Sequence, residues 1–451
     1  MFVPRLVAKA LPGWLVAGSL LGAAACSPID RTLDVAAGPA GAEGVIDFGL
    51  AMIQDRYLEP VVIGDIAFEG MRGLSKIDAA VTIDRPEPRH LILFYRKEMQ
   101  AEYTAPADDD ADGWSRLIVA VRHDASAVSR QLRDADDDIF CQAVLRASLA
   151  RLDRFSRYVG PDEARRRRAV RDGAGADPED AASPAVTMSL ARGVATIGIS
   201  TFRHGTADRV ARDLVEAEGA PGFKGVVLDL RGTPGGRLDE GVAVARLFID
   251  HGSIGLTRGR NPSSIQIYDA IPGEPGKIMP LIVLVDGGSA SAAEILAAAL
   301  QDSGRAVLVG TNTYGKGTVQ TVIRMPNDGE MTLSWARFYG PSGYPLHGLG
   351  VLPTICTADD AADPAALLAS VTKPHPAVAA NIAVWRATTI DETALRGRLR
   401  AVCPAGRHGH ASGDLAVARD LINDQSLYQR ALALTAPVAA LATTALVTPR
   451  R

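Results

Sequence analysis

The pattern of apolar and polar positions predicts an α/β core over residues 188–357. Short apolar runs such as "GVVLDL" and "PLIVLVD" alternate there with stretches such as "TADRVARDLVEAEG", in which apolar residues recur at helical spacing. Strands that alternate with helices are typical of α/β folds, and uninterrupted apolar strands are typical of a sheet buried on both faces. Residues 319–340 predict two further strands around an Asn-Asp-Gly turn, so we expect a mixed sheet.

The regions on either side of this core have other patterns. Residues 46–172 are predicted to be mostly helical, and 173–187 read as a linker rich in Gly, Ala, Asp and Pro. Residues 358–451 are Ala-rich and predict a helical extension. The uncharged stretch 431–447 is interrupted by Pro437 and is short for a membrane span, so we expect a packed helix there.

The N-terminus predicts export. Residues 1–26 combine two basic residues, an apolar stretch and small residues before Cys26, which is typical of a secretory signal, and 27–45 predict a flexible tether. The small residues before Cys26 resemble a bacterial lipoprotein box, with Ala23 where Leu is usual. Two outcomes stay open: plain cleavage, or lipidation of Cys26 and a membrane tether. Either places the protein in the periplasm or cell envelope.

The remaining cysteines fit an oxidising compartment. Cys356 and Cys403 lie in Pro-containing, loop-like segments, and we expect a disulfide between them. Cys141 has apolar neighbours at helical spacing and is predicted to be a buried thiol. The net charge of -4 over 451 residues gives no general attraction to nucleic acid.

Residues 310–320, "GTNTYGKGTVQ", nearly match the phosphate-binding loop G-x-x-x-x-G-K-[ST]. Gly310, Gly315 and Lys316 fit, but Gly317 stands where the magnesium-binding hydroxyl belongs. A phosphate-binding loop also leads into a helix, whereas β-branched residues follow Lys316. We therefore expect Lys316 to have a role other than nucleotide binding.

Residues 286–302, "DGGSASAAEILAAALQD", place serines where a buried strand turns into a helix. A helix N-terminus has free N–H groups and a partial positive charge, so a serine hydroxyl there can lie beside amides able to bind an oxyanion. Serine is also a preferred helix cap. One cap would account for Ser289 or Ser291, but not for both.

A second turn of this kind lies in residues 228–247, "LDLRGTPGGRLDEGVAVARL". A strand runs into Gly235 and Gly236, and a helix follows. The free amides of this turn could donate to the same oxyanion, although a strand–helix turn that needs positive φ explains the glycines equally well.

Together these motifs resemble the carboxyl-terminal processing peptidases, or tail-specific proteases. The likeness is carried by "DLRGTPGG", "LVDGGSASAAEILAAALQDSGRAVLVG", "TYGKGTVQ" and "LSWARFYGPSGYPLHGLGVLPTI". It is close over 190–355 and looser over 139–172. It implies a serine endopeptidase with a crotonase/ClpP-like core, acting on protein or peptide substrates without cofactor or metal.

The resemblance also assigns roles to single residues. It makes Ser291 the nucleophile, Lys316 the general base and Gln320 the residue that orients the lysine. The oxyanion hole would consist of the amide of Ala292 and one amide from the Gly235-Gly236 turn. Lys316 and Gln320 are an even number of positions apart, so we expect both side chains on one face of a strand.

A lysine base must lose its proton near neutral pH. Bringing its pKa from about 10.4 to about 7.5 corresponds to about 4 kcal/mol, and burial in a low dielectric can supply this. We therefore predict a largely buried Lys316 with no carboxylate in contact, neither Glu294 nor Asp286. The resemblance requires no catalytic histidine. We therefore expect that His204, His251 and His347 take no part in the reaction.

The chain departs from the family in one respect. Most members carry a peptide-binding PDZ domain before the core, and 173–187 is too short for any such domain. Substrate choice would then rest on the cleft and the N-terminal region. The alternative is a non-catalytic peptide-binding or adaptor protein that has kept a peptidase core.

Overall fold

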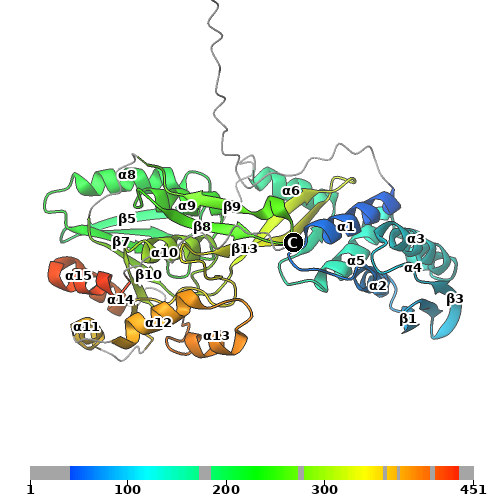
Figure 1. The fold of residues 1–451 in the computed structure, drawn as a ribbon. Coiled ribbons are helices and arrows are strands. Elements are labelled where there is room, and N and C mark those ends of the chain that lie inside the picture. The colour runs from blue at the N-terminus through cyan, green and yellow to red at the C-terminus, as the bar shows by residue number, and fades with distance from the viewer. Residues whose placement is uncertain are drawn as a thin grey trace, which may run out of the picture.

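The computed structural model describes residues 41–171, 184–272, 279–358, 363–372, 376–406 and 412–435. The predicted signal segment and Cys26 lie outside these residues. Figure 1 shows two packed halves, with the N-terminal helices on one side and the later strands and helices on the other.

A six-stranded sheet forms the centre of the larger half. Its strand order is β14-β11-β10-β7-β6-β5, and all neighbouring pairs are parallel except β5 with β6. The strands are β5 (Val186–Ala191), β6 (Val194–Ile199), β7 (Gly225–Asp229), β10 (Leu281–Val285), β11 (Val307–Gly310) and β14 (Ile355–Cys356). The expected mixed α/β architecture is confirmed.

Helices cover both faces of this sheet, because alternate strand residues point to opposite sides. In β10, Leu281, Val283 and Val285 pack into one cluster, and Ile282 and Leu284 pack into another. The first cluster contains residues of α8 (Thr206–Glu218), α9 (Leu238–Arg246), α10 (Ala292–Asp302), α12 (Pro376–Ala387) and α13 (Thr393–Arg400). The second contains residues of α11 (Pro364–Thr372), α14 (Ser412–Asn423) and α15 (Gln425–Ala433).

A smaller antiparallel sheet connects the two halves. Its strand order is β12-β13-β8-β9, and β4 also pairs with β13. The strands are β4 (Arg157–Val159), β8 (Ser253–Arg258), β9 (Gln266–Asp269), β12 (Thr318–Arg324) and β13 (Glu330–Tyr339), with η2 (Pro262–Ser264) between β8 and β9. The predicted hairpin is thus confirmed as β12 and β13.

The N-terminal half contains helices and a three-stranded sheet. The helices are α1 (Ala42–Arg56), α2 (Ile63–Arg72), η1 (Gly73–Lys76), α3 (Ala111–Val128), α4 (Arg130–Asp134), α5 (Asp137–Ala150) and α6 (Pro161–Arg171). The sheet consists of β1 (Val81–Glu87), β2 (His90–Tyr95) and β3 (Glu98–Thr104). Helix α1 starts at Ala42, inside the segment expected to be tether, because Ala42, Val45 and Ile46 are buried in the core of this half.

The tip of the β12–β13 hairpin is built into the N-terminal half. Four hairpin side chains belong to its hydrophobic core: Ile323, Met325, Met331 and Leu333. At the turn, Asn327 donates to Asp138 Oδ1 at 3.0 Å and to Tyr158 Oη at 2.8 Å. Figure 1 shows β13 reaching from the larger half to the N-terminal helices.

The cysteines have separate places in the fold. Cys356 at the end of β14 and Cys403 after α13 form a disulfide that closes a loop with a sequence separation of 47. Cys141 in α5 is a buried free thiol, as predicted. Within the described residues, no helix is both long enough and apolar enough to span a membrane. Residues 436–447 of the predicted packed helix lie outside the described part.

Candidate active site

Ser291 lies on a strained turn between the buried strand β10 and helix α10. Its φ of 55° and ψ of -118° are rare for any residue other than glycine. Asp286 shapes the turn, since its Oδ1 accepts from the amides of Gly232 and Gly288, each at 2.8 Å. A serine on a sharp strand-to-helix turn presents its hydroxyl at the end of the sheet, as in a nucleophile elbow.

The two candidate serines have different environments. Ser289 is fully buried, and its hydroxyl accepts from the Asp286 amide at 2.9 Å and donates to the Leu230 carbonyl at 2.8 Å. It is therefore a structural residue of the turn. Ser291 is half-buried and lines a cavity of about 240 Å³. The structure thus makes Ser291 the accessible hydroxyl.

The Gly235-Gly236 turn packs directly against Ser291. A Cβ at Gly235, where φ is 101°, would lie 2.7 Å from Ser291 Cβ and 3.1 Å from the Ala292 nitrogen, so no side chain fits. Within the described residues, the amides of Gly235, Gly236 and Ala292 donate no intramolecular hydrogen bond. Free amides that converge beside a hydroxyl can bind an oxyanion.

Lys316 is connected to Ser291 through the carboxylate of Glu294. This side chain is fully buried, and its Oε2 accepts from the amides of Ser291 at 2.9 Å and Lys316 at 2.8 Å. Its Oε1 accepts from the Gly315 amide at 2.6 Å and from the Thr313 hydroxyl at 2.5 Å. Burial raises the pKa of Glu294, and these four donors oppose the rise. Glu294 thus fixes the backbones of both residues relative to each other.

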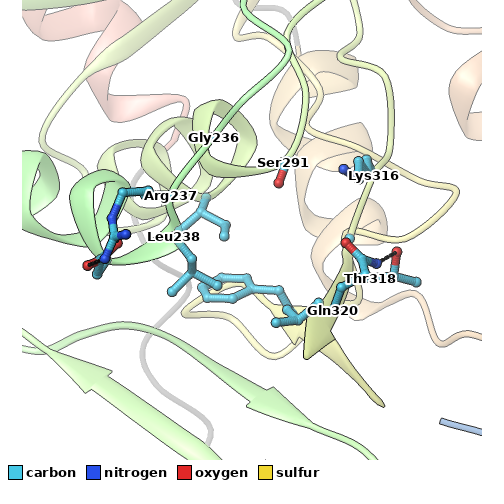
Figure 2. Close-up of a pocket in the computed structure, with 12 residues that line it drawn as sticks. Gly236, Arg237, Leu238, Ser291, Lys316, Thr318 and Gln320 are labelled. Carbon is cyan, nitrogen blue, oxygen red and sulfur yellow. Dashed lines mark hydrogen bonds and ion pairs between the residues drawn. The ribbon is translucent and has the colours of Figure 1, made fainter. Parts of the chain in front are cut away.

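The amino group of Lys316 faces the Ser291 hydroxyl in Figure 2, and both line the same cavity. The prediction that Glu294 does not contact Lys316 is wrong, because its carboxylate accepts from the lysine's backbone amide. Within the described residues, the Lys316 amine itself forms no ion pair with a carboxylate. The side chain is half-buried rather than largely buried. Burial lowers the pKa of Lys316, Arg157 and Arg154 lower it further, and Glu294 opposes them. These shifts favour the neutral amine that a base requires.

The expected geometry of Lys316 and Gln320 is wrong. Lys316 lies in the loop before β12, which begins only at Thr318, and the register of β12 shifts between Val319 and Gln320. The Gln320 carboxamide donates to Thr318 Oγ1 at 3.0 Å and to Ser334 Oγ at 3.2 Å. Gln320 nevertheless lines the same cavity as Lys316.

The rest of the cavity lining contains both apolar and charged residues. Its apolar lining consists of Leu238, Ile295, Val319 and Phe338, and its charged residues besides Lys316 are Arg237 and Asp239. None of the residues that line this cavity is a histidine, so His204, His251 and His347 lie outside the lining. A strand, not a helix, follows Lys316, as its β-branched residues predict, so the loop lacks the helix that a phosphate-binding loop needs.

Two residues have roles at the site that were not predicted from the sequence. Glu294 stands three residues after Ser291, and this S-x-x-E spacing of a capping box was a usable signal. Phe155 has its ring centroid 5.3 Å from Lys316 Nζ. It comes from the segment between α5 and β4, and no local pattern connects it to a residue so far along the chain.

Part of this chain is similar to known proteins. Residues 193–357 match the profile described as Peptidase family S41. A carboxy-terminal-processing protease of Bartonella bacilliformis is 47% identical over 133 residues, which are 30% of this chain and 31% of that protein. A carboxyl-terminal-processing protease of Picosynechococcus is 43% identical over 127 residues, 28% of this chain and 30% of that protein. The matched part thus spans about a third of these curated relatives' length.

Solved structures include a photosystem II D1 C-terminal processing protease, with a TM-score of 0.46 and 20% identity over 70% of this chain and 92% of that one. The resemblance to carboxyl-terminal processing peptidases is confirmed by the family match and the sequence relatives. Residues 193–357, which match the family profile, contain Ser291, Lys316 and the Gly235-Gly236 turn. Residues 193–357 of this chain are therefore similar to peptidase family S41.

Proposed function

We propose that the protein is a serine endopeptidase that works through Ser291 and Lys316. One observation carries the proposal: the hydroxyl of a strained serine and an amine free of carboxylate partners face each other in one cavity. The family match supports hydrolysis of peptide bonds.

The geometry suggests how the reaction proceeds. Neutral Lys316 takes the hydroxyl proton while Ser291 Oγ attacks the substrate carbonyl carbon, giving a tetrahedral intermediate. The C–N bond then breaks as the lysine passes its proton to the leaving nitrogen. Water, deprotonated by the same amine, attacks the acyl-enzyme, and the acid product leaves Ser291 free.

Two features would stabilise the intermediate. The negative oxygen would lie toward the free amides of Ala292 and the Gly235-Gly236 turn, at the positive end of helix α10. Gln320, which lines the cavity together with Lys316, would orient the lysine so that it can return the proton. The apolar lining favours an uncharged side chain next to the cleaved bond.

We also propose substrates and a place of action. The names of the relatives suggest C-terminal processing of proteins, or their degradation from a flexible end. The signal at residues 1–26 supports export to the periplasm or envelope, with Cys26 as the candidate lipid anchor. The mixed sheet with helices on both faces is compatible with a crotonase/ClpP-like core. The chain would be divided into an N-terminal region, a peptidase core and a C-terminal extension (358–451). The N-terminal region starts at Ala42 rather than at residue 46, and the core starts with β5 at Val186 rather than at residue 188.

Digestion of casein or a flexible fluorogenic peptide tests the function. Wild type should cleave, Ser291→Ala and Lys316→Ala should not, and exposed-site controls Ser189→Ala and Lys76→Ala should match wild type. Equal cleavage by all five proteins would point to a contaminant and refute the dyad. Peptide binding without cleavage by the wild type would instead favour the non-catalytic adaptor.

A further inference from the structure

The segment 153–157 of the N-terminal half reaches the catalytic lysine. It connects α5 to β4, whose residues Arg157 to Val159 pair with β13. The Lys316 amine lies over the face of the Phe155 ring, and the distance from Nζ to the ring centroid is 5.3 Å. Arg154 stacks on the same ring at 4.8 Å, and its Nη2 donates to Tyr314 Oη at 2.6 Å.

The same segment reaches Gln320 through Ser334. The carboxylate of Asp153 accepts from the amide and hydroxyl of Ser156, each at 2.9 Å, and from Ser334 Oγ at 3.3 Å. The Ser334 amide donates to Ser156 Oγ at 3.1 Å, and the Ser334 hydroxyl accepts from Gln320 at 3.2 Å. Asp153 thus rigidifies the turn that carries Phe155 and supports the residue proposed to assist the base.

We propose that segment 153–157 is a positioning element for the catalytic base, in which Phe155 covers and locates the Lys316 amine and Asp153 holds Gln320 through Ser334. This inference rests on the proposed function. Its consequence is that the N-terminal half, which lies outside the family match, completes the active site.

Physical chemistry gives the ring two opposing effects on the amine. An aromatic face attracts an ammonium, which would favour the protonated lysine. The ring also excludes water, which disfavours the charged form, and burial is the dominant influence on the lysine here. Leucine at position 155 would keep the cover without the aromatic face, whereas alanine would remove both.

Charged groups of the segment and of α10 act on the same amine, and two more line the cavity. Arg157 and Arg154 of the segment lower its pKa, and Glu294 of α10 raises it. Arg237 and Asp239, at the start of α9, line the same cavity and form an ion pair at 2.7 Å. The test therefore changes an uncharged residue and leaves these charges in place.

The experiment measures the rate at which a sulfonyl fluoride labels Ser291, as a function of pH, in the full-length protein. Phe155→Ala should move the acid limb of this profile to higher pH by about one unit, so that labelling at pH 7 falls about tenfold. Phe155→Leu should stay within about threefold of wild type with its limb unmoved or slightly lower. Thermal unfolding shows that the variants are folded.

The outcomes separate this inference from the function it rests on. An unlabelled wild type refutes the proposed peptidase. A labelled wild type with Phe155→Ala superimposable on it, or with equal losses in the alanine and leucine variants and no movement of the limb, overturns the positioning role of Phe155. Asp153→Asn supplies a second test: it should slow labelling several-fold without moving the limb, and an unchanged rate contradicts the part assigned to Asp153.

Discussion

The two proposed catalytic residues, Ser291 and Lys316, are held by two different parts of the molecule. Ser291 depends on contacts that are close in sequence or come from the parallel sheet: β10, the Asp286 turn and α10. Lys316 lies in the loop before the β12–β13 hairpin, and the tip of this hairpin packs into the N-terminal half. The Lys316 amine contacts the ring of Phe155 from that half. Ser291 is thus positioned within the residues that match the family profile, whereas the surroundings of Lys316 include a residue about 160 positions away in the sequence.

If the proposed mechanism holds, a substitution can therefore disable Lys316 as the base while Ser291 keeps its position. Glu294 is the direct connection, since its carboxylate binds the backbone of both residues. Substitutions in the sheet should displace the Ser291 hydroxyl and the amides of the proposed oxyanion site. Changes in the N-terminal half should alter proton transfer.

The largest effect is expected from Ser291→Ala. Removing the nucleophile leaves only binding and oxyanion contacts, so kcat should fall by at least about 10⁴-fold. Steady-state hydrolysis of a fluorogenic peptide measures the loss. Ser289→Ala is the neighbouring comparison: it should lower stability through its lost buried hydrogen bonds and keep most activity when folded. A reversed ranking of the two serines would contradict the assignment.

Lys316→Met should lower kcat by about 10³-fold or more, because the methionine thioether cannot accept the proton of the Ser291 hydroxyl. The unfolding temperature should change little or rise, since a half-buried amine without a carboxylate partner is replaced by an apolar chain. A variant that retains more than about a tenth of wild-type activity would show that another group is the base.

The serine half of the site could be read from the sequence because it is local. A buried strand, two glycines and a serine before a helix determine where Ser291 lies, and the alternation of strands and helices determined the fold class. The Lys316 half could not be read in this way. We expected the Lys316 and Gln320 side chains on one face of a strand, which required both residues to lie in it. The strand begins only at Thr318, so Lys316 lies outside it. The contact between Lys316 and Phe155 depends on tertiary packing, which the periodicity of apolar residues along the chain does not predict.

Glu294→Gln should weaken the connection between the two halves. The buried carboxylate accepts four hydrogen bonds, and an amide would place an N–H group against donors. We expect kcat/KM to fall about 10- to 100-fold, with unfolding free energy lower by about 1–3 kcal/mol. Labelling of Ser291 together with chemical denaturation measures both. Full activity would show that the two backbones hold their positions without Glu294.

The smallest effect on catalysis is expected from the double substitution of Cys356 and Cys403 by serine. The bridge closes a loop with a sequence separation of 47, and its loss should cost about 2–4 kcal/mol of unfolding free energy. It lies away from the cavity lining, so kcat/KM at low temperature should stay within about threefold. Cys141→Ala is the control for a cysteine outside the bridge. A loss of activity above tenfold would place the C-terminal extension in the catalytic machinery.

The pH dependence of Ser291 labelling tests the central claim most directly. Burial, Arg157 and Arg154 lower the pKa of Lys316, so the neutral amine forms at a lower pH than in a free lysine, whose pKa is about 10.4. The labelling rate of wild type should therefore rise with pH along a limb below that value, and Lys316→Met should lack the limb. An identical limb in both proteins would contradict the account.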